Sequence, residues 1–535
     1  MVFLYAIPAV LVAVIQYCYM PALNFSGWGL WFLAAFTVIT GAAVPRRSDP
    51  RHDDVPPFIG RAIIATCISC MVLIIAALAS STMFRADAYH ELLGEEKVLP
   101  YEATLPAIDL NKAPLVSRDM AQRAAEKKLS EEAALGSQVS LGRFEKQLVR
   151  GELYWVAFLE HRGFFKWYSE GSTPGYVMVS AHDASDVHLV TSVEGKSLSM
   201  KYLPSAFFGD DAHRHLYYSG HSSKLLGQYM PEIDESGRPF LVYPVLEHRV
   251  GLSGADVVGV LVLDVQTGAI QEYGNDQVPA WIDRIQDEHA VREQLADRLY
   301  LVHGWLNPSD KDRLAISGDL DIVYGSDGRA YYFAGQTSVA REGGMVSFAL
   351  IDSRTKAVSR YTLSGVTESV AQRAAEGVMP EKGYRATNAL PFTVEGVPTY
   401  VMALKDKTGI ARAFAMVSIE DFQRVAVSET LASTARQYQA KLVMDRTRLD
   451  AAAGTSLTEA KAKVLRISSE VRNGTTTYLL LLEGQGSRLF SAGPDIADTL
   501  ALTREGDLVQ VSFNQGASRI AGLVGFSNES LDALP

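Results

Sequence analysis

Four consecutive residues of this chain suggest enzymatic chemistry: Asp406, Lys407, Thr408 and Gly409, in the stretch KDKTG. An aspartate followed by Lys-Thr-Gly is the pattern in which a carboxylate accepts a phosphoryl group. Lys-Thr-Gly alone also occurs beside the nucleophilic serine of one group of acyl-transfer enzymes. Each of these two hypotheses requires further residues elsewhere in the chain.

We expect neither hypothesis to hold. The first is that of P-type ATPases, which need a cytoplasmic nucleotide domain and membrane spans after the phosphorylated aspartate, but no hydrophobic span follows residue 84. The second is that of penicillin-binding proteins, whose nucleophile lies in Ser-x-x-Lys, and we expect no such partner for Lys407. We interpret KDKTG as a hairpin tip, in which Asp406 and Gly409 supply the turn chemistry.

A His-rich insert is the other candidate for chemistry. Six of the eleven histidines lie between residues 161 and 221, and the stretch GDDAHRHLYYSGH brings together Asp210, His213 and His215. On a strand, His-x-His would point two imidazoles to one face, and a nearby carboxylate would complete a metal site. The alternative is an aromatic-rich loop that serves as a contact surface for another subunit or for a membrane face. We predict no metal, no cofactor and no catalytic residues.

The first 84 residues contain three uncharged hydrophobic stretches, at 2–20, 26–44 and 62–84. Each is close to the ~20 residues that cross a bilayer as a helix. The sequence therefore predicts three transmembrane helices. By the positive-inside rule, the N-terminus and the loop 45–61 are cytoplasmic and residues 85–535 lie outside. The arginines that carry this orientation are Arg46, Arg47, Arg51 and Arg61.

The net charge and the cysteine content bear on the partners of the protein and on its location. The formal net charge is −11, and the first 84 residues contribute +1 from four Arg and three Asp, so the rest carries −12. This balance argues against a nucleic-acid partner. Cys18, Cys67 and Cys70 all lie in the hydrophobic stretches, so residues 85–535 contain no cysteine. A cysteine-free exterior favours the bacterial cytoplasmic (inner) membrane over an animal cell surface.

The hexapeptide AQRAAE occurs twice, at 121–126 and 371–376. Each copy precedes an aromatic-rich strand and its partner strand, and two similar hairpins lie between them. An acidic residue closes or nearly closes the second strand of each hairpin. The four hairpins are 151–160 with 175–183, 237–245 with 256–273, 328–337 with 344–361, and 396–405 with 412–421, and the acids are Asp183, Asp264, Asp352 and Glu420.

This unit resembles the PepSY-type domain, most closely in GVLVLDVQTGAI, where a strand runs into Asp264-x-x-Thr267-Gly268. We identify four degenerate PepSY-like copies over residues ~115–440. The resemblance implies extracytoplasmic, non-catalytic modules that bind or inhibit partners. It carries over no catalytic residue.

Two further segments complete the prediction. Residues 281–305 are typical of an amphipathic helix, with Ile285, Val291, Leu295, Leu299 and Val302 on one stripe, either as core or as a partner groove. After a connecting helix near 430–450, short strands with Gly turns predict a five-stranded barrel of OB type.

The predicted fold class is a three-span α-helical membrane anchor, an α+β extracytoplasmic region of antiparallel-sheet repeats, and a small all-β OB-like barrel. The predicted function is a non-catalytic envelope protein that binds or scaffolds a protein partner, as a homo-oligomer or as a subunit of an envelope or transport assembly. The alternative is an envelope enzyme with a metal-assisted site at 210–221. The domains are 1–84 (spans), 85–114 (linker), 115–202 (copy one), 203–280 (insert and copy two), 281–365 (amphipathic helix and copy three), 366–452 (copy four and connecting helix) and 453–535 (barrel).

Overall fold

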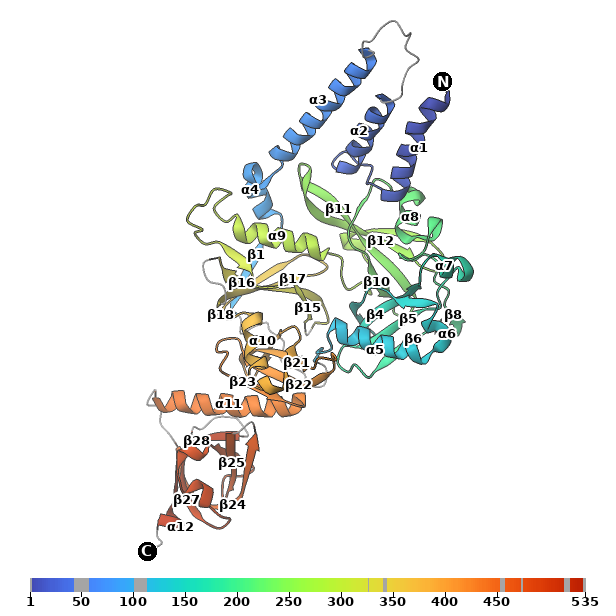
Figure 1. Ribbon diagram of the computed structural model, residues 1–535. Helices are drawn as coiled ribbons and strands as arrows, with labels where there is room; N and C mark the ends of the chain where they lie inside the picture. Colours follow the sequence, from blue (N-terminus) through green and yellow to red (C-terminus); the bar gives the residue numbers. More distant parts are fainter. Residues whose placement is uncertain are drawn as a thin grey trace. The chain divides into compact units, whose positions relative to one another are not determined.

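In the computed structural model, the chain folds into two compact units (Figure 1). Unit 1 comprises Met1–Val370, Thr387–Leu390 and Lys407–Ile410, and unit 2 comprises Ala371–Ala386, Pro391–Asp406 and Ala411–Pro535. The residues described are 2–42, 57–100, 113–325, 327–339, 344–452, 458–472, 475–513 and 520–532.

Each of the four predicted hairpins forms the centre of a sheet. In every sheet two short strands pair with the first hairpin strand, and a last strand pairs with the second. The first sheet contains β2 (Val139–Leu141), β3 (Glu145–Val149), β4 (Glu152–His161), β5 (Tyr176–Ser180) and β6 (Val187–Val190). The second contains β9 (Leu225–Leu226), β10 (Met230–Ile233), β11 (Pro239–Val250), β12 (Ser253–Asp264) and β13 (Ile270–Gly274).

The third and fourth sheets follow the same order. The third contains β14 (Leu314–Ile316), β15 (Asp321–Tyr324), β16 (Ala330–Ser338), β17 (Gly344–Asp352) and β18 (Val358–Val366). The fourth contains β19 (Arg385–Ala386), β20 (Leu390–Val394), β21 (Val397–Lys405), β22 (Ala411–Ser418) and β23 (Val425–Ser428). The period-two alternation of the hairpins therefore predicted their strands correctly.

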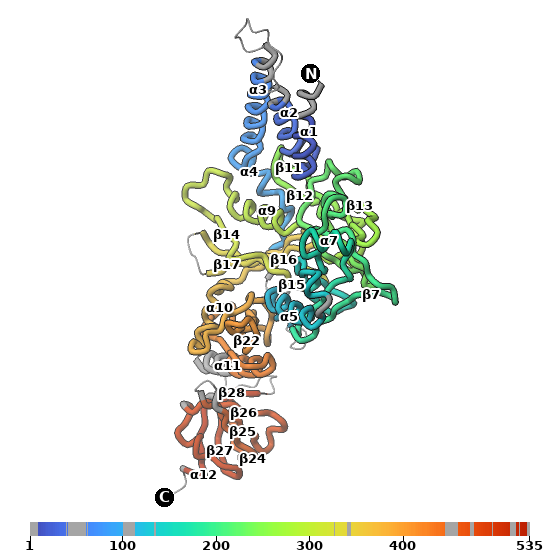
Figure 2. The backbone as a smooth tube through the Cα atoms, turned by 45° about the vertical axis from the view of Figure 1, so that its right-hand side comes forward, coloured from blue at the N-terminus to red at the C-terminus, as the bar shows by residue number. Residues whose placement is uncertain are grey.

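The third sheet also recruits a distant strand. Residues 85–114 were expected to be a linker, but β1 (Glu96–Pro100) pairs in parallel with β18. Glu96 lies 2.9 Å from Arg360 and 3.6 Å from Arg298. The preceding helix α4 (Thr82–Glu91) lies beside α9 (Glu288–Tyr300), as both Figure 1 and Figure 2 show.

Both copies of the hexapeptide are helical. They lie in α5 (Arg118–Glu131) and α10 (Glu368–Glu376). In each, the first and fifth residues of the hexapeptide are fully buried: Ala121 and Ala125, and Ala371 and Ala375. Residues four apart share one helix face, and alanine is small enough there for close packing.

The acidic residues close turns, as their positions indicated. The Asp264 carboxylate accepts from the backbone N–H of Gln266 at 2.9 Å, and Asp352 accepts from Arg354 at 2.9 Å. Gly268 follows four residues after the first aspartate with φ +76°, and Lys356 takes the same place after the second with φ +62°. The lysine therefore adopts a left-handed conformation that favours glycine. In the fourth sheet the turn carboxylate is Asp421, next to the predicted Glu420, and it accepts from Gln423 at 3.0 Å.

KDKTG is a hairpin tip, as predicted. It joins β21 to β22. The Asp406 carboxylate accepts from Arg412 at 2.8 Å, and Gly409 has φ +81°. The left-handed Gly409 has the role that turn chemistry assigns to a glycine, and Asp406 holds the first residue pair of the returning strand through the Arg412 side chain.

The predicted transmembrane anchor is wrong. The apolar helices are α1 (Val2–Tyr19), α2 (Trp28–Ala42) and α3 (Pro57–Ala79). Among the described residues, no single helix is both long and apolar enough to cross a membrane, and only Ile63–Ala79 with Thr82–Glu91, bent by 50°, qualifies as a pair. The bend falls inside the predicted span 62–84, close to Ser80, whose hydroxyl donates to Ala76 O at 2.7 Å. Arg46, Arg47 and Arg51 lie outside the described residues.

The helix predicted at 281–305 is shorter than expected. It begins at Glu288, because Asp287 caps it by accepting from Ala290 N at 3.0 Å. Val291, Leu295 and Leu299 lie in the core of the third sheet, whereas Val302, beyond the helix, is 39% exposed. The stripe from Ile285 to Leu299 is therefore core rather than a partner groove.

The predicted five-stranded barrel is present in unit 2, after α11 (Leu431–Ala452). Its strands close in the order β24-β25-β26-β28-β27 around a core that includes Leu480, Phe490 and Val511. One of its Gly turns lies at Gly506, with φ +93°. The strands are β24 (Thr458–Arg472), β25 (Thr475–Leu482), β26 (Leu489–Ala492), β27 (Leu508–Phe513) and β28 (Ile520–Asn528).

We expect Gly268→Ala to destabilise the chain by about 1–3 kcal/mol, because the new Cβ would need a left-handed φ. It would also lie 2.6 Å from the Tyr202 ring. Gly274→Ala is the control, since a Cβ there meets nothing within 4 Å. The midpoint of urea unfolding should fall for Gly268→Ala and stay unchanged for Gly274→Ala. Equal stabilities of the two variants would contradict this account of the turn.

Candidate functional site

The His-rich insert is not a strand, so its histidines do not converge. Residues Ala212–Leu216 form the short helix α8, which Asp211 caps by accepting from Arg214 N at 2.7 Å. On a helix, residues two apart point in different directions. His215 Nε2 lies 2.9 Å from Gly268 O, whereas the His213 ring lies 6.4 Å from the Tyr243 ring.

Asp210, the third metal candidate, pairs with Lys201 at 3.3 Å. Burial lowers the pKa of His213, although Asp211 opposes this. Within the described ranges, no group of three or more His, Cys, Asp or Glu side chains is placed to hold a metal ion. His213, His215 and Asp210 therefore do not form the arrangement that the metal-assisted enzyme hypothesis requires.

The insert instead holds the turn between α1 and α2. The Tyr217 hydroxyl donates to Pro21 O at 3.0 Å, and Leu23 N donates to Ser222 O at 2.8 Å. The Arg214 guanidinium lies over the Tyr17 ring, 4.4 Å from its centroid. Tyr217 and Arg214 of the insert thus contact α1 and the turn that follows it.

An aromatic patch lies at the start of the insert and on α7 (Phe164–Glu170). Phe164 contacts most of the other rings, with a centroid distance of 5.2 Å to Phe207. The outer rings are exposed: Phe165 by 83%, Tyr168 by 76% and Phe208 by 55%. We define the aromatic patch as Phe164, Phe165, Trp167, Tyr168, Phe207 and Phe208.

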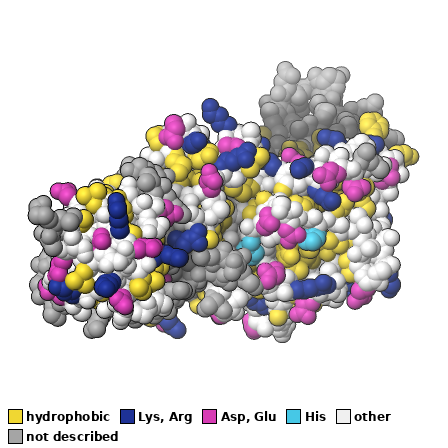
Figure 3. Space-filling view, turned by 90° about the horizontal axis from the view of Figure 1, so that it is seen from below, with side chains coloured by type: hydrophobic (Ala, Val, Ile, Leu, Met, Phe, Trp, Pro, Cys, Tyr) yellow, Lys and Arg dark blue, Asp and Glu magenta, His cyan; other side chains and the backbone are white. Residues whose placement is uncertain are grey.

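On the face shown in Figure 3, acidic and basic side chains are interspersed. All rings of the aromatic patch come from α7 and from residues 207–208.

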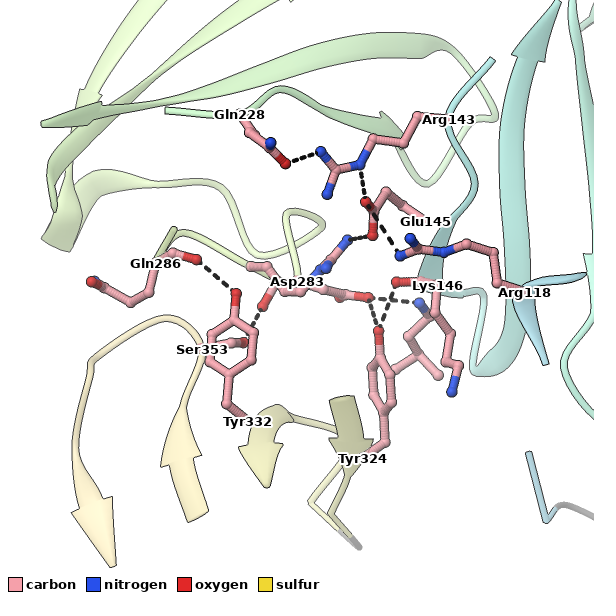
Figure 4. Close-up of polar contacts among 12 residues, drawn as sticks. Arg118, Arg143, Glu145, Lys146, Gln228, Asp283, Gln286, Tyr324, Tyr332 and Ser353 are labelled. Carbon is pink, nitrogen blue, oxygen red and sulfur yellow. Dashed lines mark hydrogen bonds and ion pairs between the residues drawn. The ribbon is translucent and has the colours of Figure 1, made fainter. Parts of the chain in front are cut away.

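A second candidate is a charged cluster in unit 1 (Figure 4). It begins on β3, where the polar residues Glu145, Lys146 and Gln147 are consecutive and all buried. We define the charged cluster as Arg118, Arg143, Glu145, Lys146, Asp283 and Arg284. Its residues come from α5, from β3 and the loop before it, and from the segment before α9.

An ion pair between Glu145 and Arg284 lies at its centre. The two side chains are each 2% exposed and 2.7 Å apart. Arg143 also donates to Glu145, and Arg118 lies 3.9 Å from it. Burial alone would raise the pKa of Glu145, but the three guanidinium groups outweigh burial and hold the pKa below its usual range. Glu145 is therefore ionised, and three cations share one carboxylate.

The same cluster ties the first sheet to the segment before α9. Asp283 accepts from Leu148 N at 2.6 Å, and the Tyr324 hydroxyl donates to Lys146 O at 3.1 Å. The Tyr332 hydroxyl donates to Gln286 O at 2.7 Å. These hydrogen bonds thus link the first sheet, the third sheet and the non-helical segment before α9 to one another.

Lys146 is the unusual cation of the cluster. It is 7% exposed, and its Nζ lies 5.1 Å from the centre of the Trp155 ring. Burial lowers the pKa of Lys146 to about 8, although Asp321 opposes this. The ammonium group is therefore charged at neutral pH at a cost in stability.

Two cavities flank the cluster and share Arg118 and Glu288. The acidic cavity, of about 330 Å³, is lined by Lys146 and by several carboxylates, among them Asp319 and Asp321. The arginine cavity, of about 480 Å³, has four arginines in its lining: Arg118, Arg143, Arg284 and Arg292.

One tetrapeptide does have Ser-x-x-Lys spacing, contrary to expectation: Ser353-Arg354-Thr355-Lys356. It lies in the turn between β17 and β18, where Ser353 Oγ donates to Asp283 O at 3.0 Å. Lys356 Nζ lies 2.5 Å from Asp256. Because this serine and lysine are held in a turn by other partners, they do not form the helical nucleophile site of a penicillin-binding protein.

No protein-family model and no curated protein matches this chain. The PepSY-type resemblance therefore stays a prediction. The charged cluster was missed from the sequence, although polar residues inside the strand-like stretch FEKQLV were a signal for it.

We expect Glu145→Gln to destabilise the chain by about 3–5 kcal/mol, because Arg284 would then be buried without its carboxylate. Replacing Arg284 by Met in the same chain should recover much of this loss. Glu247→Gln is the matched control, since Glu247 is 59% exposed and pairs with Arg249 at 3.5 Å. Urea unfolding measures the stability of all three variants. A similar loss of stability in both glutamine variants would contradict a central role for the buried pair.

We expect Lys146→Met to be more stable than the unchanged chain at pH 7, because it removes a buried charge. Between the folded pKa of about 8 and the ordinary value of 10.5, the unfolded chain binds more protons than the folded one, so the unchanged chain gains stability as pH rises. The advantage of the variant should therefore shrink over this window. Lys201→Met, at a side chain 47% exposed, is the control. An advantage that is constant from pH 7 to 10.5 would contradict the assigned pKa.

Proposed function

We propose that this chain is a non-catalytic binding protein that recognises a protein partner through the aromatic patch. The observation that carries the proposal is the exposure of Phe165, Tyr168 and Phe208 within one cluster of rings. Exposed apolar clusters mark interaction sites, and aromatic side chains dominate the binding energy of many protein interfaces.

The way the patch is built supports this proposal. Trp167 and Phe207 hold the cluster from beneath, since Trp167 also packs on the buried core of the first two sheets. Gly163 and Gly171 flank α7 as its N-cap and C-cap residues, with φ +92° and +69°. Phe208 has φ +53°, a conformation that costs a bulky residue roughly 1 kcal/mol or more. Rings that already pack on one another lose less conformational entropy when a partner binds.

The shared strand order of the four sheets is consistent with the PepSY-like assignment. That assignment and a location outside the cytoplasm belong to the proposal, because PepSY-type modules are known as extracytoplasmic partner-binding modules. The metal-assisted enzyme has no comparable support, since His213 and His215 point to different partners.

A photocrosslinking amino acid at position 165, in the cells that naturally produce the chain, tests the proposal. We expect one protein partner to be captured reproducibly. With Phe165→Ser and Tyr168→Ser combined, co-purification of that partner should fall at least about tenfold, as expected for the loss of two aromatic anchors.

The matched control combines Leu306→Ser with Phe422→Ser, at side chains 77% and 45% exposed outside the patch. It should leave co-purification unchanged. An equal loss in the control, or a crosslink only to a second copy of this chain, would overturn the proposal.

A further inference from the structure

We propose that the arginine cavity is a binding site for a small anion, a polycarboxylate or a phosphate compound, with two or more negative charges. Its four arginines come from separate parts of unit 1: α5, the loop before β3, the segment before α9, and α9 itself. The fold thus brings together four guanidinium groups that are far apart along the chain. None of the aromatic patch residues lines this cavity, so the proposal is independent of the proposed function.

The charge balance of the cavity favours an anion. Its lining contains two acids, Asp287 and Glu288. The Asp287 carboxylate is occupied by two backbone donors, Ala290 N at 3.0 Å and Gln228 N at 3.2 Å. Behind the lining, Glu145 neutralises one cation at most. Four arginines against Asp287, Glu288 and Glu145 leave one positive charge in excess, and the acid that pairs with Arg292, Asp319, is almost fully exposed to solvent.

The most exposed guanidinium groups of the cavity are those of Arg118 and Arg292. Arg284 is 2% exposed, and its Nε, which has no hydrogen-bond acceptor among the residues that the structure describes, is itself shielded from solvent. A ligand in the cavity would therefore contact Arg118 and Arg292 first. Arg118 is 54% exposed, and its ion pair with Glu145 is long, at 3.9 Å. Arg292 lies 3.4 Å from Asp319, a side chain 94% exposed.

The size and chemistry of the cavity define the ligand class. A volume of about 480 Å³ is within the range of small-molecule sites. Guanidinium groups match carboxylate and phosphate oxygens in geometry as well as charge. The neighbouring acidic cavity differs, since its lining contains five carboxylates against Arg118 and Lys146. Those five are Asp119, Glu145, Glu288, Asp319 and Asp321.

Calorimetric titration of the full chain with citrate, and separately with inorganic pyrophosphate, tests this proposal. We expect saturable binding of at least one, weakened by added NaCl. Binding of citrate alone assigns the site to carboxylates, and binding of pyrophosphate alone assigns it to phosphates. Arg118→Gln combined with Arg292→Gln should weaken binding about tenfold or more, because two charge-assisted contacts are lost.

The control combines Arg249→Gln with Arg412→Gln, which removes the same charge at side chains 49% and 51% exposed away from the cavity. It should leave the affinity unchanged. Absence of saturable binding by either anion to the folded chain would overturn the proposal. So would an equal loss of affinity in the control, because that would indicate non-specific screening of charge.

Discussion

Glu145 and Arg284 are separated by more than a hundred residues in sequence, yet their side chains lie 2.7 Å apart and are both almost fully buried. Burying either charge alone would cost several kcal/mol, on the order of the effective desolvation penalty of an ion in a protein. The pair therefore constrains where β3 and the segment before α9 can lie in unit 1. Other contacts between these elements, such as Leu148 N to Asp283, have the same consequence.

This constraint explains why the segment 281–287 is not helical, although its pattern continues that of α9. Asp287 caps α9, and the backbone before it bonds to other parts of the fold: Ile285 N and Gln286 N both donate to Ser353 O at 2.9 Å. A helix would withdraw these N–H groups from Ser353. The segment is thus irregular because its polar partners are better satisfied that way.

The two surfaces with functional potential differ in how they are built. The aromatic patch is local, since α7 and the loop at 207–208 supply all its rings. The arginine cavity is assembled from distant segments and depends on the packing of the sheets. A binding surface of the first kind can be recognised from composition, whereas a cavity of the second kind appears only when the chain is folded.

The sequence by itself determined the elements whose signal is local. Strand alternation predicted the four hairpins, Asp264 and Asp352 predicted their turns, and the short Gly-bounded strands predicted the barrel, because periodicity and turn chemistry act within a few residues. The prediction of three membrane spans was wrong because it used apolar composition alone, which does not show where a helix bends or ends.

Only the tertiary structure decided the charged cluster, the parallel pairing of β1 with β18, and the orientation of His213 and His215. Each depends on contacts between distant residues. The burial of a charge or the direction of an imidazole is set by its neighbours in space, which no single segment of sequence specifies.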